Sequence, residues 1–333
     1  MVMKNNIMIL MVALLAMVAT SSCENGNPEF DDFDYQTVYF ASQTPVRTVV
    51  LGNDPEWDLT DDNNHCVQIK ATMGGSYGNK KDIIVDYIVD ESLCDNLYFT
   101  DKDKNITDVK VTPLPTTHYR LTDDKLRIKK GEILGGVKVE LTDAFFNDPK
   151  SLSNNYVLPI RMTGIVEGAD RILEGKDYVL YGLKYANPWQ AHYLRHGKDQ
   201  VTVSGVTTEV ARHYEYVEKD EQVEITTTAY LEDVLPLTYK AVDGTSFEVK
   251  LKLAFREDGT CTVSSSTVNV TVEGEGKYVT LGEKESFGGK DRDALYLNYE
   301  VNIPEKNTVY QTVDTLVMHY RGISQEHFTP AEK

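Results

Sequence analysis

Two histidines separated by three residues form the first pattern in this sequence that could bind a metal ion. His192 and His196 lie four residues apart, which on a helix would place both side chains on one face. A zinc protease motif needs glutamate directly after the first histidine, and that position is Tyr193. A zinc site also needs a third ligand, and no nearby residue has a recognisable ligand spacing. We therefore interpret this segment as the start of a second domain and expect no metal.

The acidic residues show no recognisable calcium or catalytic pattern. Asp101–Asn105 begins like a calcium-binding loop, but Ile106 replaces the required glycine and Thr112 replaces the bidentate glutamate, so we interpret it as a hairpin tip. A chain with 52 acidic residues contains many carboxylate pairs, so their presence does not indicate a glycosidase. The glycine-rich residues 74–78 are predicted to lie between strands and not before a helix, so we interpret them as a turn and not as a phosphate-binding loop. We expect a protein that is not an enzyme and has no cofactor.

Aromatic residues give a stronger functional signal. The chain has 20 tyrosines and two tryptophans, and sugar rings stack on such side chains while carboxylates and amides bind their hydroxyls. Trp57 lies in an irregular stretch, residues 53–58, and is the best candidate for a ligand contact. The further candidates are Trp189, Tyr193, Tyr214 and Tyr216. Each of these residues could instead fill a core or a domain junction, since aromatic residues are common in strands.

The elements that must position these residues are predicted to be almost entirely β-strands. Residues 247–255 alternate apolar and charged side chains, which is typical of a half-buried strand. Similar segments are residues 37–41, 66–71, 83–89, 126–129, 137–141, 156–163, 178–185, 201–206, 222–228, 267–272, 294–301 and 312–320. Turn pairs separate them at residues 243–244, 258–259, 275–276 and 288–289. The pattern predicts an all-β fold, with an antiparallel sandwich followed by an antiparallel barrel or a second sandwich.

The chain is too long for one ordinary core, so we expect two domains. Pro188 cannot continue a ladder of strand hydrogen bonds and marks the boundary. The predicted parts are a signal peptide (1–22), an acidic flexible tether (23–34), a sandwich (35–186) and a barrel (187–333).

The N-terminal segment is predicted to direct the chain to the cell envelope. The apolar run at residues 7–18 is too short to span a membrane but fits a signal peptide. The small residues before Cys23 resemble a bacterial lipobox, with Thr20 at the place of the usual leucine. The alternative is an ordinary secretory signal cleaved near Ser22. A lipid on Cys23 would anchor the chain stably to the outer membrane.

The charge of the chain excludes some partners. Its 52 acidic and 34 basic residues give a net charge of −18, which argues against binding to nucleic acid. The acidic tether resembles the export signal of Bacteroidetes lipoproteins that reach the cell surface, and the alternative is a merely solvated leader. We expect a protein that faces the cell exterior, with the periplasmic face as the alternative.

Three cysteines remain after Cys23, and this odd number permits at most one disulfide. Cys66 and Cys94 are the favoured pair if any bridge forms, and buried free thiols are an equal alternative. The spacing of Cys66, Cys94 and Cys261 does not indicate a zinc site.

Several motifs in serial order resemble a known family. These motifs are residues 74–92, 114–115, 118–121, 128–132 and 156–163. They resemble the immunoglobulin-like domain of unknown function 1735, found at the N-terminus of many Bacteroidetes outer-membrane lipoproteins. Residues 291–297 and 314–317 resemble calycin- or lipocalin-like barrels. The resemblance implies a place in glycan-utilisation systems, but the first domain has no agreed activity.

The leading hypothesis is therefore a non-catalytic envelope lipoprotein that binds or presents a polysaccharide or oligosaccharide. Its expected partners are the membrane, through Cys23, and outer-membrane glycan-uptake proteins. One alternative is a structural or adhesive surface protein without a small ligand. The other is a barrel that binds a small hydrophobic ligand.

Overall fold

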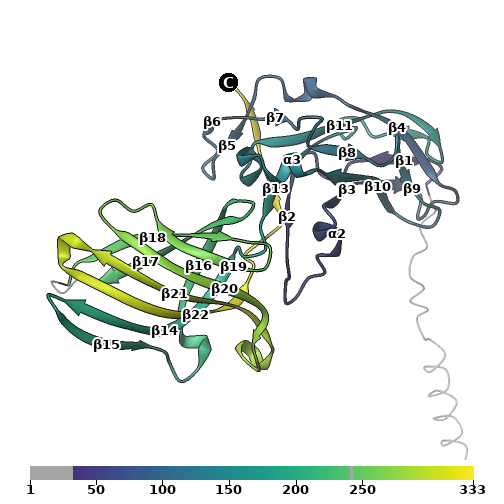
Figure 1. Ribbon diagram of the computed structural model, residues 1–333. Coiled ribbons are helices and arrows are strands. Elements are labelled where there is room, and N and C mark those ends of the chain that lie inside the picture. Colours follow the sequence, from purple (N-terminus) through teal and green to yellow (C-terminus); the bar gives the residue numbers. More distant parts are fainter. Residues whose placement is uncertain (1–32, 241–243) are drawn as a thin grey trace, which may run out of the picture.

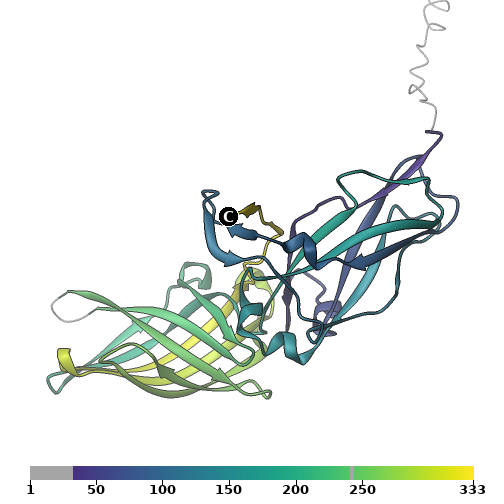
Figure 2. The same ribbon diagram turned by 90° about the horizontal axis from the view of Figure 1, so that it is seen from above.

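The computed structural model describes residues 33–240 and 244–333, which form two β-rich units (Figure 1). Strands account for 58% and helices for 8% of the structure, so the all-β prediction is confirmed. The predicted signal peptide and lipidation site, Cys23, lie outside the described residues, as does most of the tether. Seen from above, the two units lie end to end, with the C-terminal tail near their junction (Figure 2).

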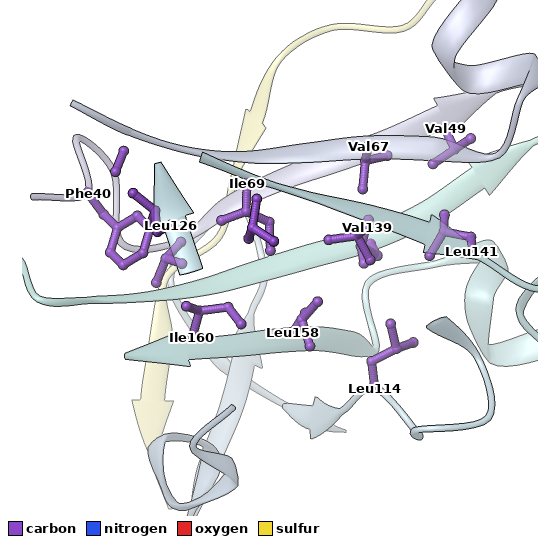
Figure 3. Packing of buried hydrophobic residues seen from close by; sticks show 14 of the residues in the cluster. Phe40, Val49, Val67, Ile69, Leu114, Leu126, Val139, Leu141, Leu158 and Ile160 are labelled. Atoms are coloured by element: carbon purple, nitrogen blue, oxygen red, sulfur yellow. The ribbon is translucent and has the colours of Figure 1, made fainter. Parts of the chain in front are cut away.

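The first unit is built on one 12-stranded sheet that wraps around a hydrophobic core. In pairing order its strands are β12 (Arg171–Ile172), β1 (Gln36–Tyr39), β3 (Cys66–Gly75), β10 (Leu134–Leu141), β9 (Lys125–Ile128), β4 (Ile83–Val89), β11 (Tyr156–Glu167), β13 (Tyr178–Ala186), β2 (Pro45–Val50) and β23 (Glu326–His327), with β7 (Thr112–Pro113) on β11 and β8 (Tyr119–Leu121) on β10. Every second residue of β3 is buried, as in a strand with one face on a core. Figure 3 shows the result: Ile69 and Val139 face Leu158 and Ile160 across the sandwich.

The second unit is a closed antiparallel barrel of eight strands. Its strands are β14 (Ala191–Val203), β16 (Glu221–Ala229), β17 (Glu232–Lys240), β18 (Ser246–Phe255), β19 (Thr260–Ser265), β20 (Thr271–Glu283), β21 (Arg292–Ile303) and β22 (Thr308–Tyr320). Pairing of β14 with β22 along their whole lengths closes the barrel. Of the two architectures predicted for this part of the chain, the barrel is therefore the one that forms.

One edge of β14 is shared by two strands. Its first half pairs with β16, ending at Arg195 opposite Glu221, and its second half pairs with β15 (Val206–Arg212), beginning at Gly197 opposite Arg212. His196 stands between these two pairings. The loop at residues 213–220, which connects β15 to β16, therefore starts and ends beside His196.

The C-terminal tail leaves the barrel and joins the first unit. β23 pairs with β2, and β24 (Pro330–Glu332) pairs with β5 (Leu97–Thr100), which also pairs with β6 (Ile106–Lys110). Phe328 is buried between these pairings, with its ring 4.8 Å from that of Phe99. We predicted residues 187–333 as one barrel domain, but the hydrogen bonds place the tail with the sandwich.

Helices are short in the described residues. They are α2 (Thr60–Asn63), α3 (Asp143–Phe146) and the 3₁₀ turns η1 (Glu91–Cys94), η2 (Pro149–Leu152), η3 (Val217–Lys219), η4 (Phe287–Gly289) and η5 (Pro304–Lys306). Within residues 33–240 and 244–333, none of the helices combines the length and the apolar character needed to cross a membrane.

Three local predictions were wrong. In the predicted strand at residues 267–272, the first four residues form a turn with positive φ at Asn269, and β20 begins only at Thr271. Residues 201–206 are not one strand, because Ser204 and Gly205 have positive φ and turn the chain from β14 into β15. Residues 275–276 are not a turn but lie inside β20. Gly276 is needed there for close packing, since a Cβ atom would come within 2.4 Å of the Leu297 side chain.

We expect Phe328→Ala to destabilise the protein by about 3 kcal/mol, because it removes a buried aromatic ring from a small hydrophobic cluster. Chemical denaturation of the purified chain measures this change. His327→Ala, which alters the exposed neighbouring side chain, should leave the free energy of unfolding nearly unchanged. Equal stabilities of the two variants would contradict the docking of the tail.

Candidate functional site

A cleft of about 800 Å³ lies where the sandwich meets the barrel. Its size is typical of a ligand site. Its lining includes the loop at residues 54–59 and the segment at residues 320–325, which leaves the barrel. The floor comes from β2, β3 and β13 of the sandwich. Figure 1 shows the loop before α2 reaching from the sheet toward the barrel.

Two polar side chains fasten the base of this loop to the sheet. The carboxylate of Asp62 is buried, accepts a hydrogen bond of 2.8 Å from the Val50 amide and pairs with Arg47. Burial raises the pKa of Asp62 above its usual value. Asn63 accepts from the backbone N–H of Gly52 and donates to its carbonyl oxygen, both at 2.8 Å. The loop is therefore held firmly at its base, and its tip projects outward.

Trp57 stands at the tip, where it lines the cleft with 73% of its surface exposed. The turn that presents it is made by Asp54, whose Oδ1 accepts hydrogen bonds from the amides of Glu56 and Trp57 at 2.8 and 3.0 Å. An exposed tryptophan on an anchored loop offers a flat apolar face to a ligand. The structure thus places this predicted residue at the site.

The rest of the cleft combines apolar side chains, among them Val46, Leu59 and Ile323, with polar ones. Carboxylates of Asp54, Glu56 and Asp58 surround the tryptophan. The hydroxyl and the backbone amide of Thr60 lower the pKa of Asp58, so this group is ionised at neutral pH. Burial raises the pKa of Tyr181 to about 12, which keeps its hydroxyl protonated. Further polar lining comes from Arg47, Thr48, Gln68, Lys70, Ser324 and Gln325.

Two of the other predicted ligand contacts are wrong, because both side chains belong to the barrel core. Trp189 is only 5% exposed and stacks on Phe255, with ring centres 3.9 Å apart and planes 6° apart. Tyr193 is fully buried and donates its hydroxyl to the Trp189 carbonyl at 2.8 Å. Tyr193 lies on the inward face of β14, and Trp189 lies in the turn just before this strand with its ring in the barrel core, so neither lines the cleft.

Tyr214 and Tyr216 are exposed, as a ligand contact would need to be, but do not line the cleft. Both lie in the loop at residues 213–220. His192 lies on a strand instead of a helix and stacks on Tyr320 with ring centres 4.4 Å apart.

The cysteines of the described residues are free thiols, so the pairing of Cys66 with Cys94 is not made. Cys94 is buried in a small apolar cluster with Phe99 and Phe328, whereas Cys66 begins β3 beside Glu140. Burial raises the pKa of Cys94 to about 12, so the thiol stays protonated and unreactive.

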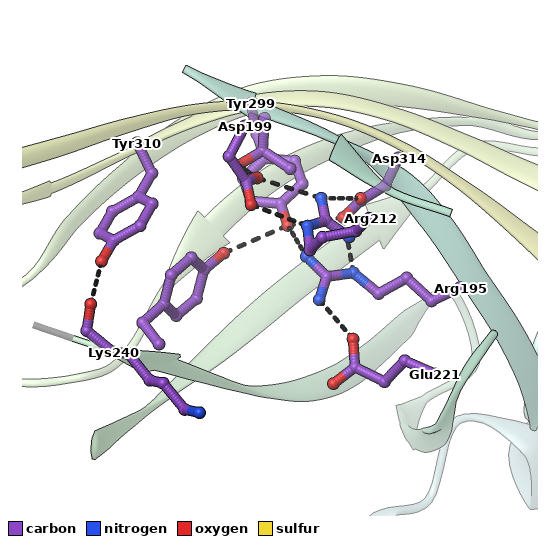
Figure 4. A network of polar contacts seen from close by, with 10 residues as sticks. Arg195, Asp199, Arg212, Glu221, Lys240, Tyr299, Tyr310 and Asp314 are labelled. Carbon is purple, nitrogen blue, oxygen red and sulfur yellow. Dashed lines mark hydrogen bonds and ion pairs between the residues drawn. The ribbon is translucent and has the colours of Figure 1, made fainter. Parts of the chain in front are cut away.

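The barrel interior is filled and contains a charged network (Figure 4). Asp314 accepts hydrogen bonds from Arg195 at 2.8 Å, from Arg212 at 2.6 Å and from the hydroxyl of Tyr299 at 2.8 Å. Arg212 also binds both carboxylate oxygens of Asp199. Sequence reasoning missed this network, since its members alternate with apolar residues on separate strands. Because charged groups and large aromatic rings fill the interior, the geometry does not favour a hydrophobic ligand there.

A second buried network joins the two units. Arg321, 4% exposed, donates to the carbonyls of Leu51, Asn53 and Asn187 at distances of 2.7 to 3.0 Å. The Asn187 side chain donates to Asp233 at 2.7 Å. Burial raises the pKa of Asp233 to about 7, even though the hydrogen bonds from Asn187 and Thr227 lower it.

Comparison with known proteins identifies the family. Residues 188–322 match the domain of unknown function 5627, and residues 33–167 match a family described as an N-terminal domain. A Bacteroides ovatus crystal structure of unknown function is 44% identical, with a TM-score of 0.82, and the alignment covers 90% of this chain and 100% of that one. The chain belongs to the same family as that Bacteroides ovatus protein.

Two further Bacteroides ovatus structures are more distant. A multidomain protein that includes the domain of unknown function 1735 is 14% identical, with a TM-score of 0.42 over 89% of this chain and 99% of that one. A protein described provisionally as carbohydrate binding is 13% identical, with a TM-score of 0.28 over 88% of this chain and 99% of that one. Similarities this low carry no argument. No curated protein matches the chain.

Burial of the Asp233 carboxyl at the junction predicts that the stability of the protein depends on pH. Because folding raises the pKa of Asp233, its contribution is complete below about pH 4 and is lost as the pH rises to about 7. We expect the unfolding free energy of the wild type, relative to Asp233→Asn, to fall by about 4 kcal/mol over this range. Urea denaturation at several pH values measures the difference. As a control, the difference between wild type and Asp103→Asn, a change on an exposed hairpin tip, should not vary in this way with pH. If the unfolding free energies of wild type and Asp233→Asn changed in parallel with pH, the role of Asp233 would be contradicted.

Proposed function

We propose that this protein is a non-catalytic glycan-binding lipoprotein of the cell envelope, and that its binding site is the cleft beside Trp57. The observation that carries this proposal is an exposed tryptophan on an anchored loop, lining a cleft of about 800 Å³ that offers both apolar surface and carboxylate, amide and hydroxyl groups. Sugars offer apolar C–H faces to stack on the indole and hydroxyls to bind carboxylates and amides. The mixture of apolar surface and polar groups in this cleft matches the two kinds of surface that a sugar presents.

The charges that line the cleft limit the classes of glycan that could bind. Among the described residues, the three carboxylates of the lining, Asp54, Glu56 and Asp58, all lie on the loop that carries Trp57. Of the three described cations in the lining, Arg47 pairs with Asp62, Arg321 donates to backbone carbonyls, and Lys70 lies on β3, away from this loop in the sequence. Like charges would repel uronic acids and sulfated sugars. The proposed ligands are therefore neutral polysaccharides or their oligosaccharides.

The envelope setting rests on the N-terminal sequence and on family resemblance. The lipobox-like segment before Cys23 supports lipidation and a place at the outer membrane, with the acidic tether favouring the outer surface. The resemblance of the sandwich to the domain of unknown function 1735, and of the barrel to calycin-like barrels, supports a role beside glycan-uptake proteins. In this setting the protein captures a glycan and presents it for import.

One observation favours the alternative of a structural or adhesive protein. Strand β15 stands at the end of the pairing order of the described residues, and six of its seven residues are exposed. An edge of this kind can add a strand from another chain. If no glycan binds, this edge is the surface on which to seek a protein partner.

We expect Trp57→Ala to weaken binding to a neutral polysaccharide by about tenfold or more, since a stacked tryptophan often dominates the affinity of a site. Calorimetry against neutral and acidic polysaccharides measures the effect. Tyr77→Ala is the matched control, because Tyr77 is also 73% exposed but does not line the cleft. Equal affinities of the two variants, or a preference for acidic glycans, would refute the proposed site.

Lipidation is testable in bacterial cells. We expect the wild-type chain to incorporate a fatty-acid label and to partition into detergent, whereas Cys23→Ser should do neither. Cys66→Ser should behave like the wild type, because that residue lies within the folded sandwich. Equal labelling of Cys23→Ser and wild type would rule out Cys23 as the anchor.

A further inference from the structure

Three side chains that commonly bind metals meet where β14 changes partner. His196 lies between the pairing of β14 with β16 and its pairing with β15. His213 directly follows β15, and Asp220 directly precedes β16. The divergence of these two strands therefore brings the ends of their connecting loop to His196. Potential ligand atoms of the three residues all lie within 4.8 Å of one another.

The distances fit a small, nearly formed coordination site. Asp220 Oδ2 is 3.1 Å from His196 Nδ1 and 3.6 Å from His213 Nδ1. In a tetrahedral zinc site with bonds of about 2.0–2.1 Å, neighbouring ligand atoms lie about 3.3 Å apart. The two distances from Asp220 lie on either side of this value, and the ligand atoms of the two histidines lie within 4.8 Å of each other, so side-chain rotation can bring all three to one ion.

The state of Asp220 points independently to a bound cation. Its side chain has no exposed surface, and its Oδ2 atom is buried with no hydrogen-bond partner among the described residues. The other oxygen, Oδ1, accepts a hydrogen bond of 3.0 Å from the Tyr214 amide. Leaving a buried carboxylate oxygen unsatisfied is costly. A metal ion placed between Asp220 and the two histidines would remove this cost.

The nearby arginines do not fill this role. Arg195 bonds to Asp314 and Glu221, and Arg212 bonds to Asp199 and Asp314. Within the described part of the chain, the ion-pair partners of Asp220 within 4 Å are His196 and His213 alone. Unlike the arginines, these two residues can offer a neutral imidazole nitrogen to a metal.

We propose that His196, His213 and Asp220 bind one divalent transition-metal ion, for which zinc is the test ion. Two imidazoles and one carboxylate are a donor set that zinc and iron(II) accept. Three protein ligands leave a further position open to water or to a donor atom of a ligand. His213 is 57% exposed, so the metal can enter from solvent. No residue of this site lines the cleft, so the proposal does not depend on glycan binding.

The three proposed ligands are too far apart in the sequence for their spacing to indicate a metal site. His196 was considered with His192, four residues away, but its partners are 17 and 24 residues further along the chain. Tyr214, an aromatic candidate for ligand contact, supplies the backbone amide that orients Asp220.

The test uses the full-length chain without a histidine tag, stripped of metal with a chelator and titrated with Zn²⁺ by calorimetry. We expect one ion per chain, and His213→Gln should weaken binding by about tenfold or more. His327→Gln is the matched control, because it removes an exposed histidine of β23 and should bind zinc like the wild type. Cobalt(II) offers a second readout, since its visible absorption reports a four-coordinate site with nitrogen ligands.

Thermal melting without metal shows whether each variant is folded. Asp220→Asn, which keeps the shape of the side chain, is the second variant and should also lose zinc. Absence of saturable zinc binding to the wild type would overturn the proposal. Undiminished binding to His213→Gln and Asp220→Asn would overturn it as well, since the ion would then lie elsewhere.

Discussion

The relative placement of the two units, and with it the cleft, depends on the buried guanidinium of Arg321. This residue directly follows the last barrel strand and donates to carbonyls of Leu51 and Asn53, at the base of the cleft loop, and of Asn187, in the linker. A buried charge is tolerated only while its hydrogen bonds are made. Movement of the barrel away from the sheet would break these bonds. One side chain therefore holds the start of the tail, the base of the cleft loop and the connection between the two units together.

The barrel has a second charged centre, which organises its closing strands. Asp314 on β22 binds Arg195 on β14 and Arg212 at the end of β15. Such networks do not add stability over an apolar core, but a register shift would leave buried charges unpaired. The network therefore favours one alignment of β14, β15 and β22. The same alignment places His196 opposite the ends of the β15–β16 loop, so the proposed metal site depends on it.

Alternation of polar and apolar residues was enough to predict the fold class, because most of the long strands in both units have one face on a core. The predicted strand at residues 83–89 coincides with β4, and the strand at residues 178–185 with nearly all of β13. The pattern could not show which glycines turn the chain. Gly259 has positive φ and does so, whereas Gly276 lies in a strand where a neighbouring side chain leaves no room for a Cβ atom. This distinction depends on residues of the next strand, which local sequence does not contain.

The candidate site residues likewise differ in how far local sequence could predict their positions. Trp57 was recognisable because an irregular polar stretch around a tryptophan indicates an exposed loop. Trp189 and Tyr193 are aromatic as well, but both are buried in the barrel core, Tyr193 on β14 and Trp189 just before it. Only closure of the barrel decides which side chains of this segment face inward. Residues 320–325, which also line the cleft, lie more than 250 residues from Trp57 in the sequence and share the cleft with it only through the tertiary fold. Local sequence can therefore reveal a side chain with suitable chemistry, whereas its partners are set by long-range strand pairing.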